Sequence, residues 1–229
     1  MKVFAIGDLH MLGGDDKPMN VFGEQWDNHV EKIFSNWRER VQPEDIVLIP
    51  GDISWAMSME NALPDLQQIG ALPGRKILLR GNHDYCWSSV AHLRDVLPAG
   101  LFAIQNDAVL LDSIAFCGSR GWTIPSADHP EDKKIYAREL IRLELSLERA
   151  KKLSASRIIV MMHYPPLGIG GVETEVSRLL ASYQVDDVVY GHLHGPEIKK
   201  AVQGEYDGVR YHFVSSDGLQ FQLYQLPET

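Results

Sequence analysis

The chain has little cysteine and no long apolar run. Only two cysteines, Cys86 and Cys117, occur among its 229 residues, so a framework of several disulfides is excluded. No stretch approaches the roughly 20 consecutive apolar residues that a membrane-spanning helix needs. The apolar segment at residues 3–6 is followed at once by charge and is too short for a signal peptide. We therefore expect a cytoplasmic protein that does not associate with membranes.

Positive charge is also scarce. Lys and Arg number 22 against 31 Asp and Glu, which leaves a net charge of −9. This balance argues against an extended surface for nucleic acid or an anionic membrane, because such surfaces need clustered Lys and Arg. It is compatible with a small anionic substrate, because the local field at a binding site outweighs the net charge. The sequence leaves the oligomeric state open.

Nothing in the chain marks a boundary between domains. The sequence contains no internal repeat, low-complexity tract or linker, and its length falls within the range of single domains. With 45% hydrophobic and 23% charged residues, its composition is that of an ordinary globular protein. We expect one domain over residues 1–229.

One pattern recurs five times along the chain. Apolar runs each end in Asp, Asn or His, usually after a glycine, and the clearest example is residues 77–79 followed by Arg80-Gly81-Asn82-His83-Asp84. Such a run is typical of a buried strand that leads into an active-site loop. The other four runs lead into Gly7-Asp8-Leu9-His10, Gly51-Asp52, His163 and Gly191-His192-Leu193-His194.

Strands and helices alternate along most of the chain, which predicts an α/β fold. The five runs are separated by segments long enough for right-handed crossovers, so their strands are expected to be parallel. Turn residues separate three shorter runs and predict antiparallel hairpins there. Asp15 and Asp16 are expected in a solvated turn. The expected helices are 25–40, 59–69, 88–96, 133–153 and 173–182, the expected hairpin strands are 101–104, 109–111 and 114–117, and the expected tail strands are 197–202, 209–214 and 219–224.

The parallel arrangement predicts where the polar residues meet. In an open α/β sheet, ligands bind beyond the carboxyl ends of the strands. Members of the pairs Asp8/His10 and His192/His194 are two residues apart, so an extended backbone is expected to point both in one direction. Seven oxygen and nitrogen ligands exceed one tetrahedral site and suit two adjacent metal ions that share a carboxylate. The seven are Asp8, His10, Asp52, Asn82, His163, His192 and His194.

Charge counting indicates the chemistry of such a centre. Two divalent ions carry four positive charges, while Asp8, Asp52 and a bridging hydroxide remove three, which leaves about +1 to stabilise a phosphoryl group in an in-line displacement. Asn82 contributes a ligand without cancelling charge. Mn, Fe, Zn, Co and Ni, as divalent or trivalent ions, all suit these ligands.

These blocks, present together and in order from Asp8 to His194, resemble the calcineurin-like metallophosphoesterase superfamily. The resemblance implies an αββα sandwich, in which helices flank two mixed β-sheets. It also implies two ligand sets that share Asp52, and a role for His83 as the residue that protonates the leaving group. One set is Asp8, His10, Asp52 and His194, and the other is Asp52, Asn82, His163 and His192.

Departures from the family pattern narrow the expected function. Serine/threonine protein phosphatases of this superfamily carry Gly-Asp-x-x-Asp-Arg-Gly in the second block, but here Asp52 is followed by Ile53-Ser54-Trp55-Ala56. The second Asp and the phosphate-binding Arg are absent. The pattern is instead similar to compact bacterial phosphodiesterases and phosphohydrolases. We therefore expect a small phosphodiester substrate, which could be nucleotide-derived, with a phosphomonoester as the alternative.

Two further residues and one rival function complete the prediction. Arg120 and Tyr164 are expected in loops at the border of the site, where they could bind phosphate. Cys86 and the histidines outside the five blocks are interpreted as ordinary structural residues. The rival function is a non-catalytic protein-interaction scaffold, since some relatives with this fold have lost metal chemistry.

Overall fold

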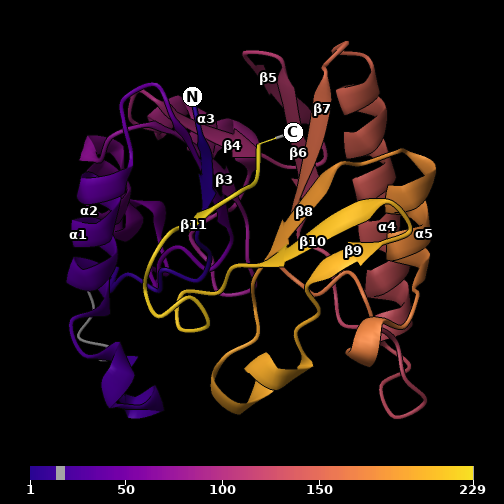
Figure 1. The fold of residues 1–229 in the computed structure, drawn as a ribbon. Coiled ribbons are helices and arrows are strands. Elements are labelled where there is room, and N and C mark those ends of the chain that lie inside the picture. Colours follow the sequence, from indigo (N-terminus) through magenta and orange to yellow (C-terminus); the bar gives the residue numbers. More distant parts are fainter. Residues whose placement is uncertain (14–18, 229) are drawn as a thin grey trace.

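Two β-sheets stack face to face at the centre of the molecule, and helices cover the outer face of each sheet (Figure 1). This computed structural model describes residues 1–13 and 19–228. Its α/β sandwich of two mixed sheets flanked by helices is the architecture that the sequence predicts. Asp15 and Asp16, the expected solvated turn, lie outside the described residues. Within the described part of the chain, no helix is long and apolar enough to cross a membrane.

The first sheet has the strand order β11-β1-β2-β3-β4, and only β11 runs antiparallel to its neighbour. Three helices pack on its outer face through a cluster that contains Ile33, Trp37 and Leu66. The strands are β1 (Val3–Ala5), β2 (Ile46–Pro50), β3 (Arg75–Leu79), β4 (Leu101–Ile104) and β11 (Tyr224–Gln225), and the helices are α1 (His29–Arg40), α2 (Met59–Ala71) and α3 (Val90–Val96).

The second sheet has the order β5-β6-β7-β8-β10-β9, with parallel pairing from β6 to β10 and an antiparallel strand at each edge. Its outer face is covered by α4 and α5, which contribute Leu143, Leu147 and Leu180 to the core there. The strands are β5 (Ala108–Leu111), β6 (Ile114–Ser119), β7 (Arg157–Met162), β8 (Asp187–Tyr190), β9 (Gly204–Tyr206) and β10 (Val209–Phe213), and the helices are α4 (Asp132–Lys151) and α5 (Glu175–Ser182).

Apolar runs without polar alternation fill both faces of the central strands. In β2, Val47 faces the helices, whereas Leu48 faces the second sheet across a middle core that also holds Phe116 and Met161. Parallel strands covered on both faces are expected to be apolar at every position. Their polar side chains are therefore confined to the ends, which is where the five blocks lie.

Three predicted elements are wrong. Strand β4 pairs in parallel with β3 and does not form a hairpin with β5. The chain passes to the second sheet between β4 and β5, and Asn106 in this connection has a left-handed φ of 60°. Residues predicted as a strand at 197–202 form instead the 3-10 helix η4 (Gly195–Lys200), which has Pro in its first turn. Gln220 and Phe221 have positive φ and interrupt the predicted strand 219–224, of which only Tyr224 lies in a strand, β11. Short 3-10 helices also occur as η1 (Met19–Phe22), η2 (Glu24–Trp26) and η3 (Ile169–Gly171).

Candidate metal centre

All seven predicted ligand residues come together where five strands end. Three strands of the first sheet and two of the second deliver them to one edge of the sandwich, so the site is built by both sheets. Two side-chain clusters can be distinguished there by their ligand-atom distances. They contain, in the loops after β1, β2, β3, β7 and β8, the residues Asp8, His10, Asp52, Asn82, His163, His192 and His194.

The first cluster gathers around His163. Its Nε2 lies 2.7 Å from Asn82 Oδ1, 3.4 Å from Asp52 Oδ2 and 3.3 Å from His192 Nδ1. His192 Nδ1 lies 3.0 Å from the same Asn82 oxygen. Atoms bound about 2.0–2.2 Å from one metal ion lie about 3 Å from each other, so this spacing suits a shared ion.

The tautomer of His163 supports this interpretation. Its Nδ1 lies 3.0 Å from the carbonyl oxygen of Pro50, which can only accept a hydrogen bond, so Nδ1 carries the proton. In the neutral ring, Nε2 then presents a lone pair toward Asn82 and Asp52. A ligating histidine that donates its other N–H to a carbonyl is the usual arrangement at protein metal sites.

The second cluster contains Asp8, His10 and His194, whose possible ligand atoms lie within 4.8 Å of one another. His194 Nε2 is 3.4 Å from Asp8 Oδ1, and its Nδ1 is 2.8 Å from Asp217 Oδ1. Nε2 of His194 and Nδ1 of His10 are buried and have no hydrogen-bond partner among the described residues. A buried unpaired nitrogen 3.4 Å from a carboxylate, as at His194, fits a cation between the two.

Asp52 lies between the two clusters. Its Oδ2 is 3.8 Å from His10 Nε2 and 3.4 Å from His163 Nε2, so one oxygen faces a histidine of each cluster. The other oxygen, Oδ1, accepts the backbone N–H of His83 at 2.8 Å. Asp8 also approaches His163, at 3.9 Å, but it faces the protonated Nδ1. Asp52 is therefore the better placed of the two carboxylates to bridge.

The electrostatics of the site favour positive charge. Burial lowers the pKa of His163, but Asp52 and Asp8 outweigh it and raise the pKa to about 9. For His194, burial is likewise outweighed by Asp8 and Asp217, and the pKa rises to about 10. Burial dominates at His10 and His192 and lowers the pKa of each to about 4. Two divalent ions satisfy the same carboxylates without protons on the ligands.

The backbone delivers these side chains in a way that the sequence did not predict. Asp8, His10, Asp52 and His192 have φ values of 58°, 43°, 52° and 75°, in the left-handed region that residues other than glycine rarely adopt. The expected extended backbone at Asp8/His10 and His192/His194 is therefore wrong, although both pairs reach the site. Clusters of such strained residues persist where the surrounding fold holds them, typically at functional sites.

Two glycines are required by close packing against the carboxylates. A Cβ on Gly81 would lie 2.1 Å from Asp52 Oδ1, and one on Gly191 would lie 2.2 Å from Asp8 Oδ2. Any larger residue would displace a predicted ligand. In the sequence these glycines appear only to mark the end of a strand. In the structure they lack a side chain because a carboxylate from another loop occupies that space.

Asp84 is a structural anchor of the site. It follows His83 in the sequence, but its carboxylate accepts the backbone N–H groups of Asp52, Ile53, Ser54 and Gly81 at 2.7–3.3 Å. Burial and the charge of Asp52 raise the pKa of Asp84 to about 6, against the effect of these donors. Asp84 ties the loop after β2 to the loop after β3 and so holds the backbone at Asp52.

We expect Asp84→Asn to lower the free energy of unfolding by about 2–4 kcal/mol, because an amide cannot accept all of these buried N–H groups. Activity should fall as well, since Asp52 loses its anchor. Denaturant unfolding followed by circular dichroism measures the effect. Asp112→Asn, at a half-exposed carboxylate paired with Arg75 on the surface, is the control and should change stability by less than about 1 kcal/mol. Equal stability of the two variants would contradict this role.

His83 lies beside the second cluster and is partly exposed. Its ring is 5.9 Å from the ring of His10 and 4.6 Å from that of Trp55, and its Nδ1 is 3.3 Å from the hydroxyl of Tyr85. Trp55 also stacks on His10, at 4.8 Å and 21°. The imidazole of His83 is thus held between Trp55 and Tyr85, beside His10.

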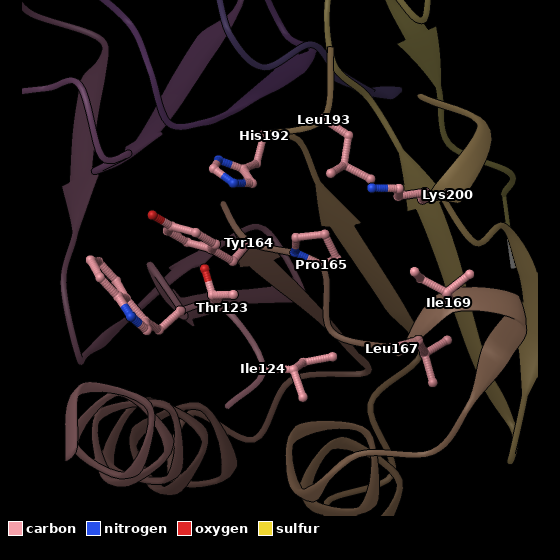
Figure 2. Close-up of a pocket in the computed structure, with 11 residues that line it drawn as sticks. Thr123, Ile124, Tyr164, Pro165, Leu167, Ile169, His192, Leu193 and Lys200 are labelled. Carbon is pink, nitrogen blue, oxygen red and sulfur yellow. The ribbon is translucent and has the colours of Figure 1, made fainter. Parts of the chain in front are cut away.

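Tyr164 borders the site, as the sequence predicted. Its ring lies 4.1 Å from that of His192, and together they line an apolar cavity of about 200 Å³ (Figure 2). Burial raises the pKa of Tyr164 to about 12, so its hydroxyl keeps its proton. The other residues at this cavity are mainly apolar, with Lys200 among them, and include Trp122, Ile124, Leu167, Ile169 and Leu193.

Arg120 also lies at the border of the site. Its carbonyl oxygen accepts the N–H groups of His163 and Tyr164, and its guanidinium stacks over Trp122 at 4.7 Å. The nearest carboxylate, Glu139, is 4.0 Å from it, so Arg120 is not held in a tight ion pair. Burial lowers its pKa from the ordinary value.

Sequence reasoning missed two residues that hold the predicted ligands. Asp217 fixes the ring of His194, and the stacking of Trp55 fixes His10. Asp217 stands shortly after an apolar run, with two serines between Val214 and Asp217. This resembles the pattern of the five blocks, so the sequence held a signal for Asp217. The contact of Trp55 had no comparable signal.

Comparison with known proteins agrees with this geometry. The profile of the calcineurin-like phosphoesterase family matches residues 1–196. The chain belongs to the calcineurin-like phosphoesterase family. Members of this family depend on a dinuclear metal centre, and the two clusters give the chain the residues for one. It is therefore assigned as a metal-dependent hydrolase. No curated protein sequence matches the chain.

Solved structures show the same fold at low sequence identity. The phosphopantetheinyl hydrolase PptH of Mycobacterium tuberculosis is 15% identical, with a TM-score of 0.55, and the match covers 100% of this chain and 96% of that one. A protein of unknown function from Aquifex aeolicus is 16% identical, with a TM-score of 0.54 and coverage of 98% and 95%. At such identity the likeness establishes the fold.

Proposed function

We propose that this calcineurin-like phosphoesterase hydrolyses a small phosphodiester by in-line displacement at a centre of two metal ions. The observation that carries the proposal is the position of Asp52, whose single oxygen Oδ2 faces a histidine of each ligand cluster. Asp8, His10 and His194 are the proposed ligands on one side of Asp52, and Asn82, His163 and His192 those on the other. Asn82 leaves the proposed centre with net positive charge for a phosphoryl oxygen.

Bound ions of this kind activate the attacking water and stabilise the charge of the phosphoryl oxygens. The chain itself supplies orientation and a proton. Asp84 and Asp217 hold Asp52 and His194 in place through hydrogen bonds, while Trp55 holds His10 by stacking. His83, partly exposed beside this centre, is the proposed donor of the proton that the departing oxygen takes.

Two features favour a diester over a monoester. The second block lacks the Arg with which related protein phosphatases bind the additional charge of a monoester, as Asp52 is followed by Ile53-Ser54-Trp55. In addition, the apolar cavity beside His192 offers room for the second organic group of a diester (Figure 2). An uncharged substituent suits its walls, which are mainly apolar.

The test is a comparison of bis(p-nitrophenyl) phosphate with p-nitrophenyl phosphate, which share a leaving group. We expect kcat/KM to be about tenfold higher for the diester, equivalent to about 1.4 kcal/mol of transition-state stabilisation. A chelator should abolish both activities, and added manganese, zinc or iron should restore them. A monoester preference would overturn the diester assignment, and turnover of neither ester would favour the protein-interaction scaffold.

A further inference from the structure

A second cavity, of about 300 Å³, lies where β3, β4 and β6 end against the first half of α4. Its walls are polar and differ in kind from those of the apolar cavity beside His192. The share of liquid volume taken by one water is about 30 Å³, so this cavity has room for a phosphate group with its hydration. The charged side chains that line it are Arg80, Arg120, Arg138, Arg142 and Glu139, and the amides Gln105 and Asn106 lie beside them.

Charge in this cavity is not balanced by its own residues. Glu139 is the only acidic residue among the described ones that line it, against four arginines. Arg142 donates to it at 2.7 Å, whereas Arg138 and Arg120 stand at 3.7 and 4.0 Å. One carboxylate cannot neutralise four guanidinium groups. The cavity therefore carries about three positive charges in excess.

One buried donor in the cavity is also left without a partner. Nε of Arg80 has no hydrogen-bond partner among the residues described by the structure. Buried polar atoms are nearly always paired, with protein, water or a ligand. An anion in the cavity would accept from Arg80 and from the other guanidinium groups, whose planar forks match phosphate oxygens.

The cavity adjoins the metal centre through the chain itself. Arg80 is two residues before Asn82, and the carbonyl of Arg120 accepts the N–H groups of His163 and Tyr164. Both arginines thus belong to the loops that carry proposed metal ligands. A group bound in the cavity sits at the same edge of the sandwich as the ester at the metal centre.

We propose that this arginine-lined cavity is a binding subsite for a phosphate group other than the one being hydrolysed. In the favoured case, which rests on the proposed phosphodiesterase function, that phosphate is a second phosphate of the substrate. The substrate is then a diester with a further phosphate on its organic part. A free phosphate ion has the same chemistry and is the other source.

Arg138→Gln is the test variant. Its side chain is 54% exposed and stands 3.7 Å from Glu139, which Arg142 continues to hold, so its loss leaves the buried carboxylate paired. Arg149→Gln is the matched control, because Arg149 lies in the last turn of the same helix and does not line the cavity. Thermal unfolding of both variants establishes that they are folded.

The first measurement uses the p-nitrophenyl ester of thymidine 5′-phosphate with and without a 3′-phosphate, so that the leaving group is constant. We expect the wild-type metalloenzyme to prefer the 3′-phosphorylated ester. Arg138→Gln should reduce the ratio of the two kcat/KM values by about tenfold, the effect of one lost charge-assisted hydrogen bond. The ratio should be unchanged in Arg149→Gln.

The second measurement is calorimetric titration of the metal-loaded protein with inorganic phosphate, which needs no turnover. We expect two phosphates per chain, one of them bound about tenfold more weakly in Arg138→Gln. Weakened binding with no preference between the esters would support the subsite and identify free phosphate as its ligand. Binding and ester ratio both equal to those of Arg149→Gln would overturn the subsite. If wild-type protein hydrolyses neither ester, the proposed function fails, while the titration still decides whether the subsite exists.

Discussion

Asp52→Asn is expected to reduce kcat/KM for bis(p-nitrophenyl) phosphate by about three orders of magnitude or more. Oδ2 of Asp52 faces Nε2 of a histidine in each cluster, and the other oxygen, Oδ1, is already engaged by the N–H of His83. An amide at this position removes a negative charge between two proposed cations and presents only one oxygen. Repulsion between the ions then increases, and metal affinity falls together with activity.

Metal content distinguishes this effect from general damage. Elemental analysis should give two metal ions per wild-type chain and fewer in Asp52→Asn, while circular dichroism shows both proteins folded. Asp95→Asn, at an exposed carboxylate in α3, should keep wild-type activity and two ions. If Asp52→Asn retains full turnover and two ions, the dinuclear assignment is wrong.

His83→Ala is expected to slow hydrolysis by about 10²–10⁴-fold for esters with a poor leaving group. His83 belongs to neither proposed ligand set, and its imidazole stands partly exposed between Trp55 and Tyr85. Nitrophenolate departs readily as an anion, whereas an alkoxide such as a ribose oxygen needs a proton as it leaves. The loss should therefore be much larger for a nucleoside ester than for a nitrophenyl ester.

Two further readouts separate proton transfer from positioning. Metal content of His83→Ala should equal that of the wild type, because no ligand is removed. Tyr85→Phe, which removes only the hydroxyl near His83 Nδ1, is the matched variant and should have a much smaller effect. Equal losses on both kinds of ester would mean that His83 positions the phosphate or the water and that another group is the acid.

The sequence by itself was sufficient for the α/β class and for the residues that meet at the site, while the sandwich followed from the resemblance to the family. The reason is that parallel strands buried on both faces read as apolar runs, and their polar residues are confined to the ends. Asp52, Asn82 and His163 could thus be assigned to one edge before the fold was known. Each strand is a short continuous segment, so the sequence alone shows where the strand ends and which polar residue follows it.

The sequence predicted the wrong local structure at two places, a turn between strands and the backbone at Asp8 and His10. The turn residues between the expected strands 101–104 and 109–111 predicted a hairpin, yet β4 joins β3 in parallel and the turn takes the chain to the other sheet. The extended backbone predicted for Asp8 and His10 is replaced by left-handed residues. At Asp8 and His10 the partners come from another loop, since the carbonyl oxygens of Gly51 and Asp52 accept their N–H groups.

Only the tertiary structure decided which residues support the site. Asp84 is adjacent to His83 in sequence but holds the backbone at Asp52, 32 residues away. Asp217 reaches His194 across 23 residues. Arginines from the ends of two strands and from α4 line one cavity together with a single carboxylate. Hydrogen bonds and charges act over a few ångströms in space whatever the separation along the chain, so packing determines them and residue order does not.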